Sequence, residues 1–263
     1  MATAKDIHVA PISQKDAATL VKRVHYSGKI VNNSQLHFGV FLNGKLEGVM
    51  SFGASLDKRK TQGLISGTAW NDFLELNRMA FSEALPRNSE SRALSIAFKL
   101  IKKHYPHIEW IISFADGTQC GDGTIYRASG FVLTQINSNK TLIMLPWGET
   151  IANICLSDTR RPMRLQVAKK LGIQVDNGAS TIKPFLDAGC KVMKGFQLRY
   201  VYFLNPKAKE RLTVQILPFS EIAKVGATMY RGKRPDSVSN TPAFQVGTGG
   251  ANPTSGLQTF SGN

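Results

Sequence analysis

The stretch at residues 112–131, ISFADGTQCGDGTIYRASGF, restricts the fold of this chain more than any other. It overlaps a short apolar run, residues 108–114, whose isoleucines and aromatic residues predict a buried strand. Asp116 follows where that strand emerges, Thr124 can cap a short helix, and Gly130 can end the helix in a left-handed conformation. A strand, a polar exit, a short helix and a new strand form the kind of corner where α/β enzymes keep their chemistry.

The size and composition of the chain exclude several classes of protein. Its 263 residues, 42% of them hydrophobic, can bury one sizeable core or two small ones. No apolar run approaches the roughly 18 residues of a membrane span, and the N-terminus lacks the apolar region of a signal peptide. Cys120, Cys155 and Cys190 are widely spaced without a CxxC pair, so neither a disulfide framework nor a zinc site is expected. We expect a cytosolic protein with reduced cysteines and no membrane partner.

Positive charge is concentrated in one part of the sequence. The net charge is +15, and residues 1–149 carry 17 Lys and Arg against 12 Asp and Glu, whereas residues 150–234 carry 16 against 5. The second segment therefore holds +11, and residues 235–263 contain a single charged side chain, Asp236. This concentration indicates a polyanionic partner, foremost nucleic acid, with nonspecific basicity or an anionic membrane as alternatives.

Apolar periodicity and turn residues predict the elements as far as residue 147. Asn43 and Gly44 supply a positive-φ turn between two apolar runs, which predicts a hairpin. Alternation along the strand at 73–81 places Glu75 and Asn77 on one face and Arg78 on the other. The expected elements are a helix at 14–24, the hairpin at 36–53, a loop at 59–69, the strand at 73–81, a helix at 89–104 and a second hairpin at 131–147.

The second half of the sequence has a different character. Residues 150–198 contain two short basic helices, TRRPMRLQVAKKLG and STIKPFLDAG, before a strand returns at 197–205. We expect one α/β domain at 1–206 that includes 150–198 as a basic helical insert. A basic extension at 207–234 and a Gly-, Ser- and Pro-rich tail at 235–263, expected to be disordered, complete the chain.

Several segments together resemble known proteins. The order helix, hairpin, strand, helix, strand, short helix, strand and the segment YRASGF resemble the GNAT acyltransferase fold and the YxxxGF pattern of its fourth helix. A more specific ordered set is His25-Tyr26-Ser27, Glu75-Leu76-Asn77-Arg78, Asn88-Ser89-Glu90-Ser91, Ala115-Asp116, Gly123-Thr124-Ile125-Tyr126 and Arg199-Tyr200-Val201-Tyr202-Phe203-Leu204. This set resembles the Mom family of phage DNA-modification proteins, a divergent GNAT branch, over roughly residues 7–206.

The resemblance implies a GNAT-like fold, with a central mixed sheet flanked by helices, in a phage-encoded transferase of the host cytoplasm. It implies that adenine in double-stranded DNA is converted at N6 to a methylcarbamoyl (acetamido) form, which shields the DNA from restriction. Because N6 is paired inside the stack, the base must be flipped out before reaction. Two other functions are left open: a GNAT N-acyltransferase acting on a small molecule, protein or RNA, and a phage DNA-binding protein without enzymatic activity. No oligomeric state is predicted.

The expected donor-binding segment departs from ordinary GNAT enzymes, which hold the pyrophosphate of acetyl-CoA in a glycine-rich loop. Here the segment reads PRNSES and contains no glycine, so close approach of the backbone is less favourable. The helix N-terminus and Arg87 still offer N–H groups and positive charge to an anion, with Asn88, Ser89 and Ser91 beside them. The donor is therefore left open between acetyl-CoA and an aminoacyl-tRNA such as glycyl-tRNA.

Four residues are candidates for catalysis. Asp116 can accept the proton of adenine N6, a poor nucleophile whose lone pair is delocalised into the ring, and the alternative is an N-cap of the short helix. The resemblance implies that Tyr126 donates to the leaving group, with packing against Phe131 as the alternative. It also implies that His25 and Tyr26 face the substrate.

Polar residues of the strand at 73–81 are candidates for binding substrate or donor. Burying Glu75, Asn77 and Arg78 without partners is costly, so they contact substrate or belong to a structural Glu–Arg network. The resemblance adds Thr124 to this set.

No metal site is predicted, because the histidines other than His25 lack the spacing of metal ligands. Convergence of His25, Tyr26 and Asp116 around iron or zinc in three dimensions is the alternative.

The first basic helix of the insert carries the candidate DNA contacts. Arg161, Arg164 and Lys169 are expected to share a face that lies along phosphates, and the alternative is a solvated face. Met163 and Leu165 are expected to contact the core. The candidate DNA contacts are Arg160, Arg161, Arg164, Lys169 and Lys170.

Overall fold

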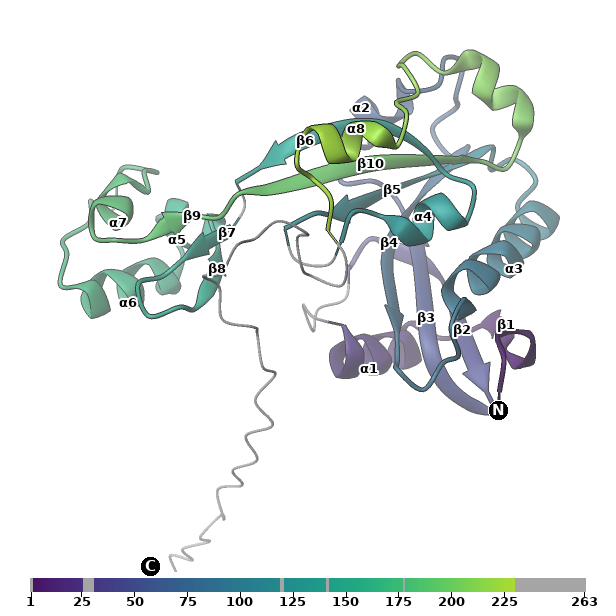
Figure 1. Ribbon diagram of the computed structural model, residues 1–263, viewed down its shortest axis with the longest axis horizontal. Helices are drawn as coiled ribbons and strands as arrows, with labels where there is room; N and C mark the ends of the chain where they lie inside the picture. Colours follow the sequence, from purple (N-terminus) through teal and green to yellow (C-terminus); the bar gives the residue numbers. More distant parts are fainter. Residues whose placement is uncertain (1, 26–30, 119–120, 141, 177, 230–263) are drawn as a thin grey trace, which may run out of the picture.

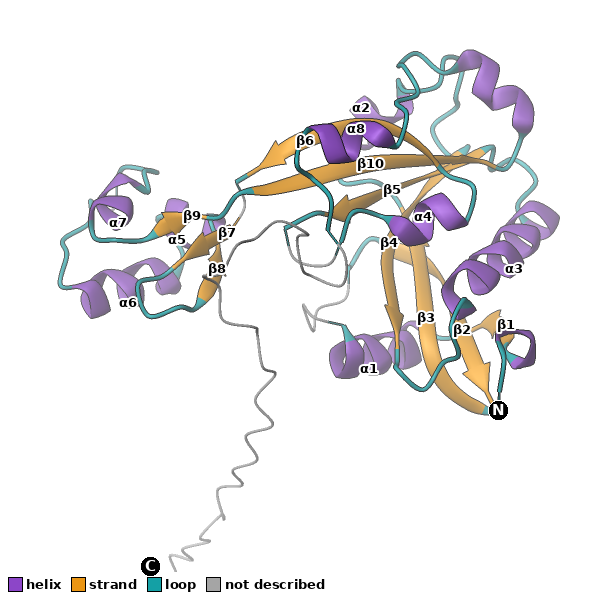
Figure 2. Cartoon of the chain, viewed as in Figure 1, coloured by secondary structure: helices purple, strands orange, loops and turns teal. Residues whose placement is uncertain are grey.

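The computed structural model describes residues 2–25, 31–118, 121–140, 142–176 and 178–229. A seven-stranded mixed sheet in the order β1-β2-β3-β4-β5-β10-β6 forms the main body, and a three-stranded sheet in the order β8-β7-β9 belongs to a second unit (Figures 1 and 2). The strands of the main sheet are β1 (His8–Pro11), β2 (Ser34–Leu42), β3 (Lys45–Gly53), β4 (Phe73–Phe81), β5 (Trp110–Asp116), β6 (Val132–Asn139) and β10 (Gly195–Phe203). The helices around it are α1 (Gln14–Val24), α2 (Lys58–Gln62), α3 (Ser89–His104), α4 (Thr124–Ala128) and α8 (Ser220–Lys224), with 3-10 turns η1 (Ala4–Asp6) and η2 (Pro206–Arg211).

Helices α1 and α3 pack on opposite faces of the sheet, because side chains alternate between faces along each strand. Val49 of β3 packs with Leu20 of α1, whereas its neighbour Met50 joins the core beneath α3. The β2–β3 turn has Asn43 at φ 50° and Gly44 at φ 76°, which confirms the predicted hairpin. The predicted bounds of α1, β4 and α3 are also confirmed.

The order of the elements confirms the α/β class and the GNAT-like arrangement. Strands β4 and β5 run parallel, and β10 lies antiparallel between β5 and β6. The predicted hairpin at 131–147 is wrong, because β6 pairs with β10 and the chain leaves the main sheet before Leu142. Ile143 and Leu145, which gave that segment its apolar pattern, are buried in the core of the second unit.

The second unit spans residues 142–192 and is called the insert from here on. It consists of β7 (Leu142–Met144), β8 (Thr150–Ala152), α5 (Ile154–Ser157), α6 (Pro162–Leu171), α7 (Lys183–Asp187) and β9 (Lys191–Val192) around its own apolar core. Figure 1 shows the insert at the end of β6 and β10, away from α1 and α3. The two helices predicted from the sequence are α6 and α7. The small sheet is not evident from the sequence, because its strands are too short to show alternation.

Arg164 lies inside the insert, which corrects its assignment as a DNA contact. Its side chain is fully buried and lies beside Phe185, with 5.3 Å between the guanidinium carbon and the ring centre. The guanidinium donates hydrogen bonds to the carbonyl oxygens of Leu156, Asp176, Ala179 and Thr181. Arg164 therefore joins α5, α6 and the loop before α7. The basic pattern of this helix does not distinguish an arginine that binds carbonyl groups from one that faces water.

Replacing Arg164 by Met should unfold the insert while the main sheet stays folded. Carbonyl oxygens that are closed off from water would lose their donor, a loss of about 3 kcal/mol or more. Hydrogen exchange followed by mass spectrometry should show protection lost across residues 142–192. Lys169→Met, which alters an exposed residue of the same helix, is the control and should keep that protection. Equal protection in the two variants would contradict the structural role of Arg164.

The chain continues from β10 through η2 and α8, whose Ala208 and Ile222 are buried in the main body. The loop predicted at 59–69 includes most of the short helix α2. Residues 230–263, where the sequence predicts the disordered tail, lie outside the described residues, as does Cys120. In the described part of the chain, the helices are all too short or too polar to cross a membrane.

Candidate functional site

Strand β4 contains a bulge at the point where it separates from β5. The register of β4 against β3 shifts by one residue at Asn77, and the parallel ladder between β4 and β5 ends at Glu75 and Ile112. A bulge redirects side chains and is common beside active sites. The bulge interrupts the simple alternation predicted for this strand and brings Glu75, Asn77 and Arg78 to the point of divergence.

Glu75 and Asn77 form a polar cluster with neighbouring loops. Asn77 accepts a hydrogen bond from the Ser34 hydroxyl at 3.1 Å and donates one to the Ala54 carbonyl oxygen at 3.3 Å. Burial raises the pKa of Glu75, and hydrogen bonds from Ser55 and Asn77 oppose that rise. The cluster therefore holds a carboxyl group that binds a proton more readily than an exposed glutamate does.

Arg78 contacts His25, the residue that caps the C-terminus of α1. Arg78 Nη1 lies 3.3 Å from His25 Nε2, and because a guanidinium only donates, this ring nitrogen is the acceptor. Burial, followed by the charge of Arg78, lowers the pKa of His25 from 6.5 to about 4, so the ring is neutral near pH 7. The sequence left open a structural Glu–Arg network on this strand. The described contacts instead join Arg78 to His25 and Glu75 to Ser55 and Asn77.

The free energy of unfolding should decrease as the pH is lowered from about 6.5 to about 4. In this window the unfolded chain binds a proton at His25 that the folded chain does not bind, because its pKa is about 4 when folded. The variant His25→Gln keeps an acceptor for Arg78 but does not titrate, so its stability should fall less steeply. Urea denaturation at a series of pH values measures both slopes, and groups common to both proteins cancel. Identical pH dependence would contradict a buried, neutral histidine.

The N-terminus of α3 offers polar groups to an anion. Asn88 precedes the helix with φ 69° and makes no side-chain cap, and the Ser91 hydroxyl donates to the Asn88 carbonyl oxygen at 3.2 Å. Ser89 is fully buried, and its hydroxyl has no hydrogen-bond partner within the described residues. Arg87 is exposed next to this turn. The first turn of this 16-residue helix therefore combines a dipole, an uncapped terminus and a nearby cation.

Asp116 ends β5, and its carboxylate accepts a hydrogen bond from the Thr118 N–H at 2.8 Å. The alternative role of Asp116 as an N-cap of α4 is wrong, because Gly123, at φ 83°, takes that position. The prediction that Thr124 caps this helix is wrong as well, since its hydroxyl donates to Asp122 at 2.9 Å. Asp116 is therefore oriented by a backbone N–H at the end of the strand.

Asp122 is a buried residue whose role the sequence did not reveal. Its carboxylate pairs with Arg127 at 3.0 Å, and its carbonyl oxygen accepts a hydrogen bond from the Tyr200 hydroxyl. The Tyr126 ring centre lies 5.1 Å from that of Tyr200 and 5.2 Å from that of Phe131, so the predicted packing against Phe131 is confirmed. These contacts hold α4 against β10. The only sign of them in the sequence is the Asp-Gly pair, which indicated a turn.

The other predicted DNA contacts are exposed on the insert: Arg160, Arg161, Lys169 and Lys170. Arg160 and Arg161 share Asp158 as an ion-pair partner, at 3.1 Å and 3.6 Å. Lys170 Nζ lies 3.8 Å from the centre of the Trp147 ring, an arrangement in which the cation and an aromatic face are presented together. The insert therefore presents cations to solvent, although not on the single face predicted.

Met163 and Leu165, predicted as core contacts, are exposed to 37% and 50%. The prediction is wrong because the side of α6 that faces the core carries Arg164, Val167 and Ala168.

Tyr26 lies outside the described residues, so its predicted place beside His25 stays a prediction. Within the described residues, no three or more His, Cys, Asp and Glu side chains form a group that could hold a metal ion. The convergence of His25, Tyr26 and Asp116 around iron or zinc also stays a prediction.

Comparison with known proteins gives a family for the chain. Residues 6–221 match the model of the Mom protein family, and the methylcarbamoylase Mom of Escherichia phage Mu is 34% identical over 213 residues, 81% of each chain. Among solved structures, the chain is similar to the ribosomal-protein-S18-alanine N-acetyltransferase of Escherichia coli, with TM-score 0.40, 11% identity, 76% of this chain and 94% of that one. It is also similar to the spermidine/spermine N-acetyltransferase of Vibrio cholerae, with TM-score 0.40, 8% identity, 80% of this chain and 99% of that one. The chain belongs to the Mom protein family.

Proposed function

We propose that this chain is a phage transferase that places a methylcarbamoyl group on N6 of adenine in duplex DNA and thereby protects the DNA from restriction. The observation that carries the proposal is its membership of the Mom family over a segment that includes every residue of the site described above. The fully basic character of the insert surface supports a nucleic-acid substrate over a small molecule.

The chemistry at the acceptor requires a base. The N6 amine forms a bond to the transferred group and loses a proton, and its delocalised lone pair makes it a poor nucleophile until that proton is removed. Asp116 is the residue assigned to accept the proton, because a strand end and a backbone N–H fix its carboxylate. Neutral His25, held by Arg78, is a second acceptor near the bulge of β4. Tyr126 is assigned the donation of a proton to the leaving carrier.

The donor is assigned to the N-terminus of α3. A methylcarbamoyl group contains an amide nitrogen, which an acetyl group lacks and a glycyl group has together with the same carbon and oxygen atoms. Atom balance therefore favours glycyl-tRNA over acetyl-CoA as the source. A phosphate of the carrier would meet the first turn of α3 near Arg87, Ser89 and Ser91, where N–H groups and the helix dipole favour an anion.

The duplex is assigned to the insert and the target base to the site. Arg160, Arg161, Lys169 and Lys170 would lie along phosphates, and their ion-pair partner Asp158 is too exposed to hold the arginines strongly. Contacts of this kind supply the free energy that unpairs and unstacks the adenine.

Mass spectrometry of nucleosides tests the proposal. DNA, RNA and protein from cells that produce the chain should be compared with those from cells that carry an empty vector. We expect an adenine nucleoside that is heavier by one methylcarbamoyl group in DNA alone. Modification confined to RNA, protein or small molecules would indicate the other acyltransferase function, and unmodified DNA that is nevertheless bound would indicate a DNA-binding protein.

A further inference from the structure

Leu56 is an apolar side chain placed in water at the edge of the site. Its side chain is 91% exposed, more than any other large hydrophobic residue in the described part of the chain. A single exposed leucine needs no explanation by itself. Its surroundings do, because the loop that carries it is built of the residues that contact the polar cluster of β4.

The residues just before Leu56 are fixed to that cluster. The carbonyl oxygen of Ala54 accepts hydrogen bonds from the side-chain amides of Asn33 and Asn77. Ser55 is buried, contacts Thr61 Oγ1 at 3.1 Å and hydrogen-bonds to Glu75. The backbone is therefore anchored on one side of Leu56 within a residue or two of its Cα.

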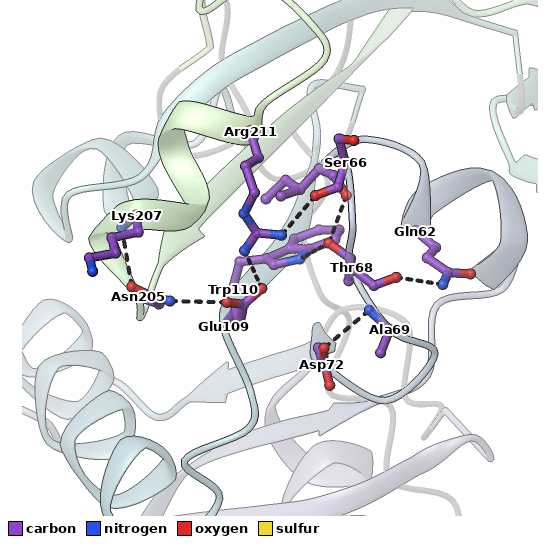
Figure 3. A network of polar contacts seen from close by, with 11 residues as sticks. Gln62, Ser66, Thr68, Ala69, Asp72, Glu109, Trp110, Asn205, Lys207 and Arg211 are labelled. Atoms are coloured by element: carbon purple, nitrogen blue, oxygen red, sulfur yellow. Dashed lines mark hydrogen bonds and ion pairs between the residues drawn. The ribbon is translucent and has the colours of Figure 1, made fainter.

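The segment after Leu56 is anchored as well (Figure 3). Gln62 Nε2 donates to the Thr68 carbonyl oxygen at 2.7 Å, and Trp110 Nε1 donates to the Thr68 hydroxyl at 3.1 Å. Arg211 of η2 donates to the Ser66 carbonyl oxygen at 2.7 Å and pairs with Glu109. These bonds tie the segment to β5 and to the residues that follow β10. Leu56 therefore projects from a backbone that is held at both ends.

Cations and an aromatic ring flank this leucine. Lys58 Nζ lies 4.6 Å from the centre of the Trp70 ring, which is 51% exposed, and it accepts no carboxylate partner in the described structure but donates to Asn71 at 3.1 Å. Arg59 and Lys60 are exposed on the following turn. An apolar tip between cations matches a duplex, in which phosphates surround stacked bases.

We propose that Leu56 enters the base stack of duplex DNA and occupies the space left by the flipped adenine, while Arg59 and Lys60 contact the flanking phosphates. This inference rests on the proposed function. Flipping a base leaves an apolar gap in the stack, and an apolar side chain that fills the gap lowers the free energy of the flipped state. Leu56 suits this role because it starts in water and its backbone is anchored next to Glu75 and Asn77. It is a positioning residue, since it touches neither the reacting nitrogen nor the donor.

Leu56→Ala should lower the rate of modification of fully paired duplex DNA by about 10-fold or more, the effect of losing roughly 1.4 kcal/mol of stabilisation of the flipped state. The full-length protein would be assayed in a cell extract that supplies the donor, with two oligonucleotide duplexes. One pairs the target adenine with thymine, and the other places the adenine opposite an abasic site. The second duplex has no pair to break, so on it the variant should approach the wild type. Leu56→Met, which keeps the apolar volume, should restore most of the activity on the paired duplex.

The control is Val225→Ala, which shortens another exposed apolar residue, 44% exposed at the end of α8, and should act as the wild type on both duplexes. Two results would overturn the inference: Leu56→Ala equal to the wild type on the paired duplex, or an equal loss on both duplexes. If the wild type modifies neither duplex, the proposed function has failed, and this outcome is distinct from either of the other two.

Discussion

Asp116→Asn should reduce the amount of modified adenine by ~100-fold or more while binding to duplex DNA remains near that of the wild type. Asparagine keeps the size of the side chain and an oxygen that can accept the Thr118 N–H, so the turn after β5 should keep its shape. It cannot accept a proton from the attacking amine. The expected loss therefore falls on the chemical step and leaves recognition intact. Nucleoside mass spectrometry and a DNA-binding titration, made on the same preparations, measure the two effects separately.

The matched control for this variant is Asp187→Asn, which removes a carboxylate from the exposed Lys183–Asp187 ion pair of α7. It should modify adenine as the wild type does. Near-normal modification by Asp116→Asn would remove Asp116 from the mechanism. Loss of DNA binding by the same proportion as activity would show that Asp116 supports the structure of the site and does not act as the base.

Replacing Arg160, Arg161, Lys169 and Lys170 by Gln should weaken binding to every duplex and flatten its dependence on salt. Each phosphate contact that is lost should reduce the log–log slope by about 0.9, because fewer counterions are released on binding. The expected change for the four residues together is about 3 to 4 units of slope. Arg164 is left in place, since its burial among carbonyl groups gives it a structural role. A salt titration of duplex binding is the measurement.

The control for this variant removes the same charge from another surface: Lys22, Lys99, Lys102 and Lys103, all exposed on α1 and α3, replaced by Gln. It should retain most of the slope. A similar loss of slope in both variants would mean that the overall charge of the protein attracts DNA and that the insert is not a specific contact surface. Removal of residues 235–263, whose only charged residue is Asp236, should change neither affinity nor slope.

Much of the fold follows from local signals in the sequence. The amphipathic spacing of α1 and α3, the Asn43-Gly44 turn and the apolar strand at β4 each depend on neighbouring residues, and their predicted positions are confirmed. The second hairpin could not be predicted correctly in this way. Strand β6 pairs with β10, about sixty residues later in the chain, and the apolar residues after β6 belong to a different core. Nonlocal pairing of this kind leaves no local signature.

The site shows the same division. Asp116 could be proposed from its place after an apolar strand, and its position at the end of β5 is confirmed. The bulge at Asn77 could not, because a single unpaired residue does not change the apolar pattern of a strand. Arg164 was placed on the wrong side of its helix, because its partners are backbone carbonyl groups that any sequence provides. Buried cations with such partners are recognised from the structure alone.

The measurement that tests the central claim most directly uses a duplex in which the target adenine carries nitrogen-15 at N6. The purified protein would react with it in an extract that supplies the donor, and the modified nucleoside would then be fragmented in a mass spectrometer. We expect the fragment that contains the methylcarbamoyl group to retain the nitrogen-15 label, with no such product from Asp116→Asn. A methylcarbamoyl fragment without the label, or an unmodified duplex in the presence of active wild-type protein bound to it, would contradict the account.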